Sequence, residues 1–235
     1  MPDSGTGRTD TTTLSLSLDV MNRAKRVHRR AMIETPYPMP VDWWTSELIA
    51  QGFPLPDGMP SSLRRIDVFR YAEGASQDPE RALTLLWYAL AWGSGKALRQ
   101  NRRRIESVGA DRSAIVEHLA RAAGLAAVSP FRAFEVLFPG GRSLIKSLGP
   151  AFATKFLYFA GGGAADHPSL ILDSVVATVL KNDCGWRSLA TSGGWPADTY
   201  ERYCQLCARW AEDLEVAPDQ VEFALWHRDD RPPSS

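Results

Sequence analysis

The chain of 235 residues has few cysteines, no long apolar run and no excess charge. Three cysteines, an odd and low number without an export signal, predict a reducing environment, and we expect a soluble cytoplasmic protein. No apolar stretch reaches the roughly 20 residues that cross a bilayer, so a membrane role is not expected. Lysine plus arginine equals aspartate plus glutamate at 27 each. This balance leaves room for a local basic face that binds nucleic acid.

The cysteine spacing also bears on metal binding. Cys204 and Cys207 are separated by two residues, as in many zinc and iron–sulfur sites, but only Cys184 could join them. Such sites use four ligands, and the apolar neighbours predict buried thiols on a helix instead. We therefore expect no metal and no cofactor.

The residues that are abundant predict a packed all-α fold. Apolar residues make up 44% of the chain and eight of its residues are tryptophan, which is enough for a substantial core. Alternating polar and apolar positions are sparse, so strands are not expected. We predict a two-lobed helical domain over residues 14–228, with disordered ends at 1–13 and 229–235, and a monomer.

Capping and breaking residues place the helices. Asp78 followed by Pro79 marks the start of a buried helix over 80–92, which Gly93-Ser94-Gly95 interrupts. A basic helix follows over 96–108. The other expected helices span residues 41–51, 61–73, 112–127, 131–138, 143–148, 150–161, 170–181, 197–215 and 218–227, with extended connectors at 34–40 and 52–60.

Residues 143–161 have the layout of a helix-hairpin-helix. A short helix, a tight turn at Gly149 and Pro150, and a second helix follow one another. Free amides at the start of the second helix, near Ala151, can bind a DNA phosphate together with the positive end of the helix dipole. Such a contact positions DNA without reading its sequence. An ordinary turn between two helices is the alternative interpretation.

With the segment that follows, the hairpin resembles the helix-hairpin-helix DNA glycosylases of the 8-oxoguanine type. Asp173 begins a helix after apolar residues, as the catalytic aspartate of that family does. Lys155 lies eighteen residues before it, on the second hairpin helix, and resembles the nucleophilic lysine of bifunctional members. The turn departs from the family pattern, in which the lysine follows the turn glycine by two residues, where Ala151 stands here. Alone, Asp173 could be only a helix cap and Lys155 only a solvated lysine.

The resemblance extends over about residues 65–227 and implies further site residues. The break at 92–95 matches the family element that faces DNA, so Gly95 and Arg102 would contact the backbone, and Gln100 or Asn101 would fill the gap left by a flipped base. Two basic clusters could serve phosphates or be solvated helix faces: Arg23, Lys25, Arg26, Arg29 and Arg30, and Lys96, Arg99, Arg102, Arg103 and Arg104. The pocket would include Trp92, Phe152 and His167. Residues 218–226 resemble the C-terminal segment of bacterial proteins with this fold.

The resemblance implies base excision from double-stranded DNA. A modified purine would rotate out of the duplex, Lys155 would attack the sugar, and Asp173 would stabilise the developing charge. Without a competent lysine, Asp173 would activate water instead. Two other hypotheses stay open. One is a catalytically silent DNA-binding protein of the same fold, such as an accessory of a phage-defence system. The other is a helical interaction domain whose basic faces bind an acidic partner.

Overall fold

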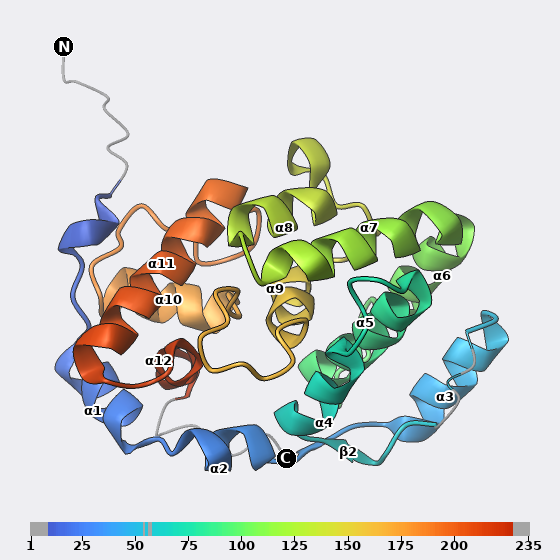
Figure 1. The fold of residues 1–235 in the computed structure, drawn as a ribbon, viewed down its shortest axis with the longest axis horizontal. Coiled ribbons are helices and arrows are strands. Elements are labelled where there is room, and N and C mark those ends of the chain that lie inside the picture. Colours follow the sequence, from blue (N-terminus) through green and yellow to red (C-terminus); the bar gives the residue numbers. More distant parts are fainter. Residues whose placement is uncertain (1–8, 54, 56–57, 228–235) are drawn as a thin grey trace.

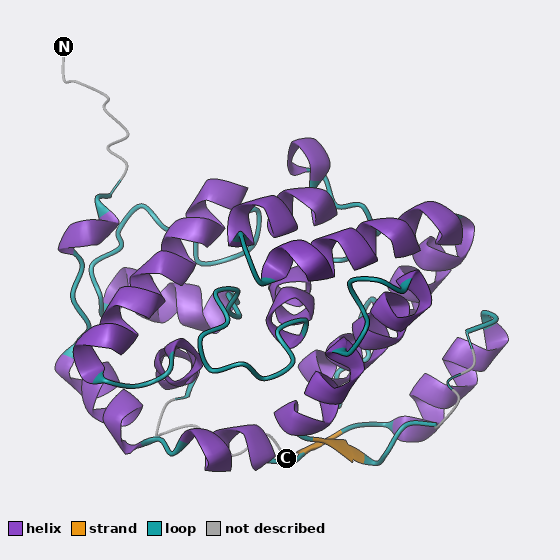
Figure 2. Ribbon diagram, viewed as in Figure 1, coloured by secondary structure: helices purple, strands orange, loops and turns teal. Residues whose placement is uncertain are grey.

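The computed structural model describes residues 9–53, 55 and 58–227 (Figure 1). The fold is all-α as predicted, and helices dominate every part of the view in Figure 2. Within the described ranges, the sheet content is one two-stranded ladder. Strand β1 (Tyr37–Pro38) pairs antiparallel with β2 (Ser62–Leu63), with Tyr37 opposite Leu63. The ladder joins the expected extended connector 34–40 to residues 62–63, which were expected to begin a helix.

The helices follow in chain order. Their bounds are α1 (Leu18–Arg26), α2 (Arg29–Glu34), α3 (Val41–Ala50), α4 (Arg65–Phe69), α5 (Pro79–Ser94), α6 (Asn101–Ala110), α7 (Arg112–Ala126), α8 (Pro130–Leu137), α9 (Pro150–Phe159), α10 (Ser174–Asn182), α11 (Ala197–Leu214) and α12 (Pro218–Trp226). Three short 3₁₀ turns, η1 (Thr11–Thr13), η2 (Arg70–Ala72) and η3 (Pro139–Gly141), complete the order.

Side-chain caps explain where several helices begin. Asp78 accepts hydrogen bonds from the first amides of α5, and Ser129 caps α8 in the same way. Both are followed by proline at the first helical position, where its missing N–H costs nothing. Asp173 caps α10 through the amides of Val175 and Val176. The start after Asp78 agrees with the sequence prediction, and Asp173 is a helix cap, as one interpretation of the sequence expected.

Helix α9 buries every residue from Ala153 to Phe159 and lies near the centre of the molecule (Figure 1). It contacts α5, α7 and α8. Helix α8 in turn contacts α11, while α12 packs on α1, α10 and α11. The hydrophobic core runs through all of these contacts, and α5 buries every residue from Ala82 to Ala91 except Thr84. The site described below lies where α5, α9, α10 and α12 converge.

Ordered structure begins nearer to the N-terminus than expected. Residues 9–14 run along α11, where Arg209 donates to the Leu14 carbonyl at 2.9 Å and Arg202 donates to the Thr9 carbonyl. Residues 9–13 therefore correct the expected disordered segment 1–13. Residues 1–8 and 228–235 lie outside the described residues.

Four expected helices differ in the structure. Residues 170–172 of the helix expected over 170–181 are extended, and α10 begins at Ser174. Residues 143–148 form turns, because Ser143 bonds the Ile145 and Leu148 carbonyls and Ser147 has a positive φ of 67°. Residues 96–100 are not helical, so α6 begins only at Asn101 after Gln100, which is left-handed with φ 69°. The helix expected over 61–73 starts at Arg65, after β2. In each case local backbone geometry or pairing overrides the hydrophobic pattern.

A buried ion pair joins the early and late parts of the chain. Arg65 of α4 donates to Glu222 of α12 at 2.9 Å and to the Tyr158 hydroxyl of α9 at 3.0 Å. Both charged side chains are essentially inaccessible. Each charge needs the other, because an unpaired buried charge is strongly destabilising.

Among the described helices, none has the length and apolar character needed to span a bilayer.

We predict that Arg65→Met lowers the free energy of unfolding by about 3–5 kcal/mol, because Glu222 loses its partner in the interior. The double variant Arg65→Met/Glu222→Leu should recover most of that loss. Arg30→Ala, which removes the exposed Arg30–Glu34 pair, should cost no more than about 0.5 kcal/mol. Urea unfolding measures all three. A cost for Arg65→Met as small as that for Arg30→Ala would contradict the prediction.

Candidate functional site

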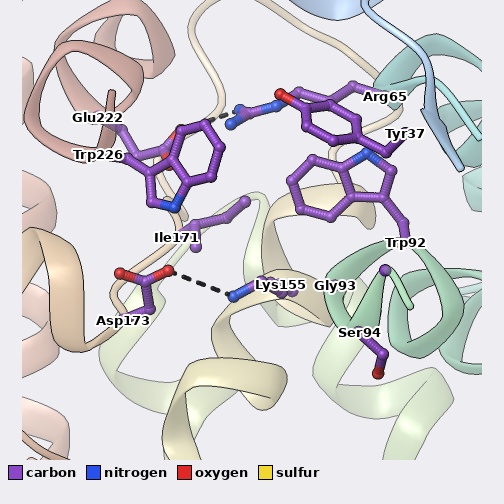
Figure 3. Close-up of a pocket in the computed structure, with 11 residues that line it drawn as sticks. Tyr37, Arg65, Trp92, Gly93, Ser94, Lys155, Ile171, Asp173, Glu222 and Trp226 are labelled. Carbon is purple, nitrogen blue, oxygen red and sulfur yellow. Dashed lines mark hydrogen bonds and ion pairs between the residues drawn. The ribbon is translucent and has the colours of Figure 1, made fainter. Parts of the chain in front are cut away.

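A cavity of about 180 Å³ opens at the junction of α4, α5, α9, α10 and α12. Figure 3 shows Lys155 and Asp173 facing each other at one side and the aromatic rings gathered at the other. The volume lies below the roughly 300–1,000 Å³ of pockets for drug-sized ligands. The lining residues are Tyr37, Arg65, Trp92, Gly93, Ser94, Gly95, Lys155, Ile171, Asp173, Glu222 and Trp226.

The structure brings Lys155 and Asp173 together. Lys155 Nζ lies 3.7 Å from Asp173 Oδ2 and 3.4 Å from the Ala151 carbonyl oxygen on its own helix. The two oxygens of Asp173 have separate roles. Oδ1 accepts from the amides of Val175 and Val176, while Oδ2 faces the amine. The cap thus fixes the carboxylate in the direction of Lys155.

The extended stretch 170–172 leads to Asp173 at the cavity, and three side-chain hydroxyls hold the backbone of this stretch in place. Thr154 exchanges hydrogen bonds with both the amide and the carbonyl of Leu172, each at 3.1 Å. Tyr200 donates to the Leu170 carbonyl and Tyr203 to the Ile171 carbonyl. These bonds satisfy buried backbone groups that no helix or strand satisfies. Because Thr154 precedes Lys155, one turn of α9 fixes both members of the pair.

Burial changes the acid–base behaviour of Lys155. Its side chain is 10% exposed. Burial lowers the pKa of the amine below its ordinary value of 10.5, because the ammonium loses hydration. The Asp173 carboxylate acts in the opposite direction and raises the pKa, although less strongly. The outcome favours the neutral amine more than in an exposed lysine.

Aromatic rings and a second charged pair form the rest of the cavity. Tyr37 meets Trp92 edge to face at 5.4 Å between ring centres and lies 6.4 Å from Trp226. The Arg65 guanidinium lies 5.2 Å from the Trp92 ring centre, which extends the buried pair with Glu222 into the cavity wall. Burial raises the pKa of Glu222. The cavity therefore combines flat apolar walls with polar groups that can bond an inserted planar ligand.

The expected turn at Gly149 and Pro150 is present, but the helix expected before it is a loop. Gly149 caps α9 with extended backbone and no side-chain cap, and Pro150 occupies the first helical position. Gly149, Pro150 and Ala151 are all partly exposed. The turn is present, but the element before it is the looped segment 143–148 rather than a helix. Since the first turn of α9 has no capping side chain, it keeps the uncapped character that phosphate binding requires.

The segment after α5 differs from the expected gap-filling element. Asn101 is fully buried, donates to Ser94 Oγ at 2.9 Å and accepts a hydrogen bond from Arg104. It is thus an internal link and cannot enter DNA, which corrects that assignment. Gln100 is partly exposed at the turn, and Gly95 lines the cavity. Arg102 is engaged by Glu47 in a bidentate pair.

Several members of the two basic clusters bond other groups of the protein, whereas others are exposed. In the first, Arg29 pairs with buried Asp219 and Arg23 donates to the Ala224 carbonyl, so both hold α12 in place. In the second, Arg104 is buried and donates to the Ser147 carbonyl at 2.8 Å; burial lowers its pKa to about 10. Lys96 and Arg99 are exposed, and the described part of the chain places no carboxylate within ion-pair distance of them. These two remain available on the turn beside the cavity.

Two expected pocket residues lie outside the lining. His167 is buried, bonds the Leu157 carbonyl at 2.9 Å and packs so closely on Gly161 that a Cβ there would clash with the imidazole. Burial lowers its pKa. Phe152 lies behind the cavity wall, where its ring centre is 5.5 Å from Lys155 Nζ and 4.0 Å from the Arg104 guanidinium. Trp92 is a lining residue as expected.

Sequence reasoning missed Tyr37, Arg65, Glu222 and Trp226 as cavity residues. Tyr37 and Arg65 lie far from Lys155 in sequence and follow no motif. Glu222 and Trp226 lie one helical turn apart in the segment 218–226, where the sequence shows a resemblance without a role. That four-residue spacing on one helix face is the available signal.

The structure thus defines an all-α protein in which a buried lysine faces a helix-capping aspartate in an aromatic cavity. Residues 30–226 match the family described as "Putative 8-oxoguanine DNA glycosylase OGG-like protein". The match covers more than half of the chain, so the chain belongs to this family of glycosylase-like proteins, and membership indicates DNA as its partner. Comparison with curated proteins and with solved structures gave no match.

We predict that Lys155 titrates below 10.5 in NMR of the protein labelled at lysine side-chain carbons, because burial opposes the ammonium. Asp173→Asn should lower the Lys155 pKa further, since the carboxylate that stabilises the ammonium is lost while asparagine still caps α10. The control Asp42→Asn changes an exposed aspartate on α3 and should leave Lys155 unchanged. An unshifted Lys155, or one that does not respond to Asp173→Asn, would sink this description.

Proposed function

We propose that this protein is a DNA glycosylase that excises a modified purine, of the 8-oxoguanine type, from duplex DNA. One observation carries the proposal: Lys155 Nζ lies 3.7 Å from Asp173 Oδ2 inside an aromatic-walled cavity. The reaction needs a neutral amine, a carboxylate beside it and a cavity for the base. Family membership supports the same interpretation.

The chemistry follows from the two side chains. The neutral amine of Lys155 attacks the sugar carbon C1′, the bond from C1′ to the base breaks, and its electron pair leaves with the base. Asp173 Oδ2 is placed to stabilise the positive charge that develops on the sugar and to accept a proton from the amine. The C1′–O4′ bond of the sugar then opens as the lysine nitrogen forms the C=N double bond of a Schiff base, and O4′ takes up a proton. Loss of a proton from C2′ then expels the 3′ phosphate, which cleaves the strand. With Asp173 acting on water alone, the base would leave without a covalent intermediate.

The flipped base requires a place beside the amine. The cavity provides flat rings at Tyr37, Trp92 and Trp226, which can stack on a planar base, and the polar edge of Glu222. Its small volume suits a single flipped base better than an extended ligand. These contacts support base flipping as the route into the site.

Contacts with the DNA backbone would come from two sides of the cavity. The uncapped start of α9 at Gly149, Pro150 and Ala151 would bind one phosphate through its amides. Lys96 and Arg99 would approach the backbone from the turn after Gly95, and Gln100 at that turn would fill the gap left by the base. Arg102 would reach DNA only if it released Glu47.

The test uses duplex DNA with one modified purine, 8-oxoguanine first, under single-turnover conditions. We expect base excision and a borohydride-trapped covalent adduct with the native protein, and no adduct with Lys155→Ala, because the attacking amine is absent. Asp173→Asn should lower the excision rate by about 100- to 10,000-fold while DNA binding is retained. Lys181→Ala, which changes a lysine in the last turn of α10 outside the cavity lining, serves as the matched control and should behave as the native protein.

Each other outcome has a defined meaning. Excision without an adduct would indicate the water route through Asp173. Salt-dependent duplex binding without excision of any base in a panel of modified purines would contradict the enzyme proposal and favour a catalytically silent DNA-binding protein. Absence of duplex binding would contradict both.

A further inference from the structure

Gly93, in the last turn of α5, lies directly against the side chain of Lys155. A Cβ at this position would come within 2.5 Å of Lys155 Cδ, 3.1 Å of its Cε and 3.2 Å of Phe152 Cε1. Contacts as short as the first are not tolerated without movement. The stem of Lys155 therefore occupies the volume that a side chain at position 93 would fill (Figure 3).

We propose that Gly93 is a positioning residue for Lys155: the bare helix backbone leaves the channel along which the lysine stem reaches Asp173. The proposal rests on the proposed function for its catalytic meaning, although the geometry it describes exists without any substrate. It assigns to the Trp92–Gly95 break a role inside the site, in addition to ending the helix.

The identity of the residue supports this role. Within a helix, glycine is less favourable than every other residue except proline, so a glycine there needs a reason. Its φ is not positive, so backbone strain is not that reason. The reason is the lack of space for a side chain at position 93. At Gly109, by contrast, a Cβ would meet Phe53 at an ordinary 3.8 Å.

The surrounding contacts prevent the helix from moving away. Ser94 accepts from Asn101 at 2.9 Å, which ties the end of α5 to the start of α6. Arg104, one turn further along α6, bonds the Ser147 carbonyl before α9 and stacks on Phe152. The end of α5, the start of α6 and the approach to α9 thus form one linked unit. An added methyl group at position 93 would therefore displace the flexible lysine rather than the backbone.

Displacement of the stem moves the amine. Lys155 Cδ is two bonds from Nζ, so a shift at Cδ carries the amine away from its 3.7 Å contact with Asp173. Because misplacement of a reacting group by about 1 Å can cost roughly 100-fold in rate, this shift would be visible in the chemistry.

The experiment compares Gly93→Ala with Gly109→Ala, a helical glycine with room for the methyl group. The first readout is the Lys155 pKa by side-chain NMR, which should differ from that of the native protein in Gly93→Ala, because displacement changes both causes of the native pKa, burial of the amine and its contact with Asp173. The second is the rate of borohydride trapping on duplex DNA with an abasic site, which should fall by about 100-fold. The thermal midpoint should not fall, and Gly109→Ala should match the native protein in both readouts.

Native Lys155 pKa and native trapping rate in a folded Gly93→Ala would overturn the proposal. If the single variant does not fold, Gly93→Ala/Phe152→Leu removes the ring contact and leaves only the clash with Lys155, with Phe152→Leu as its reference; equal pKa and rate in these two would likewise overturn it. The readouts separate the two proposals. If the native protein neither excises a base nor forms an adduct, the enzyme proposal fails, while the NMR comparison still decides the role of Gly93.

Discussion

The site depends on one buried contact, that between the amine of Lys155 and the carboxylate of Asp173. A charged lysine in the interior is costly unless an opposite charge lies nearby. Asp173 meets this need with one oxygen, while its other oxygen caps α10. The same carboxylate thus begins a helix and faces the amine. Burial favours the neutral amine and Asp173 favours the ammonium, so the balance between them sets how reactive Lys155 is.

The rest of the fold holds Lys155 and Asp173 at their positions beside the cavity. Thr154, Tyr200 and Tyr203 satisfy the backbone of 170–172, where regular secondary structure is missing. A second ion pair, between Arg65 and Glu222, closes the opposite wall, so the cavity carries balanced charge although it is largely buried. Each wall comes from a different part of the chain. The cavity therefore exists only when the whole helical domain is assembled.

The features that could be predicted from the sequence are those that depend on neighbouring residues, such as helix caps. The cap at Asp78 placed the start of α5, and the resemblance to the helix-hairpin-helix DNA glycosylases implied the Lys155–Asp173 pair. The rest depends on tertiary contacts. Segment 143–148 has an apolar helical pattern, yet Ser143 satisfies its carbonyls and it stays looped. Asn101 looks exposed on a polar run but is buried by its bonds to Ser94 and Arg104. Arg65 and Tyr37 meet the site only through long-range packing, which no local pattern encodes.

Peptide mapping of the reduced adduct is the most direct test of the central claim. The native protein would be trapped with borohydride on duplex DNA that contains an abasic site, digested, and examined by mass spectrometry for the modified residue. We predict that the modification lies on Lys155 alone, because its amine is the one held beside a carboxylate in the cavity. Modification of an exposed lysine such as Lys96, with Lys155 unmodified, would contradict the account.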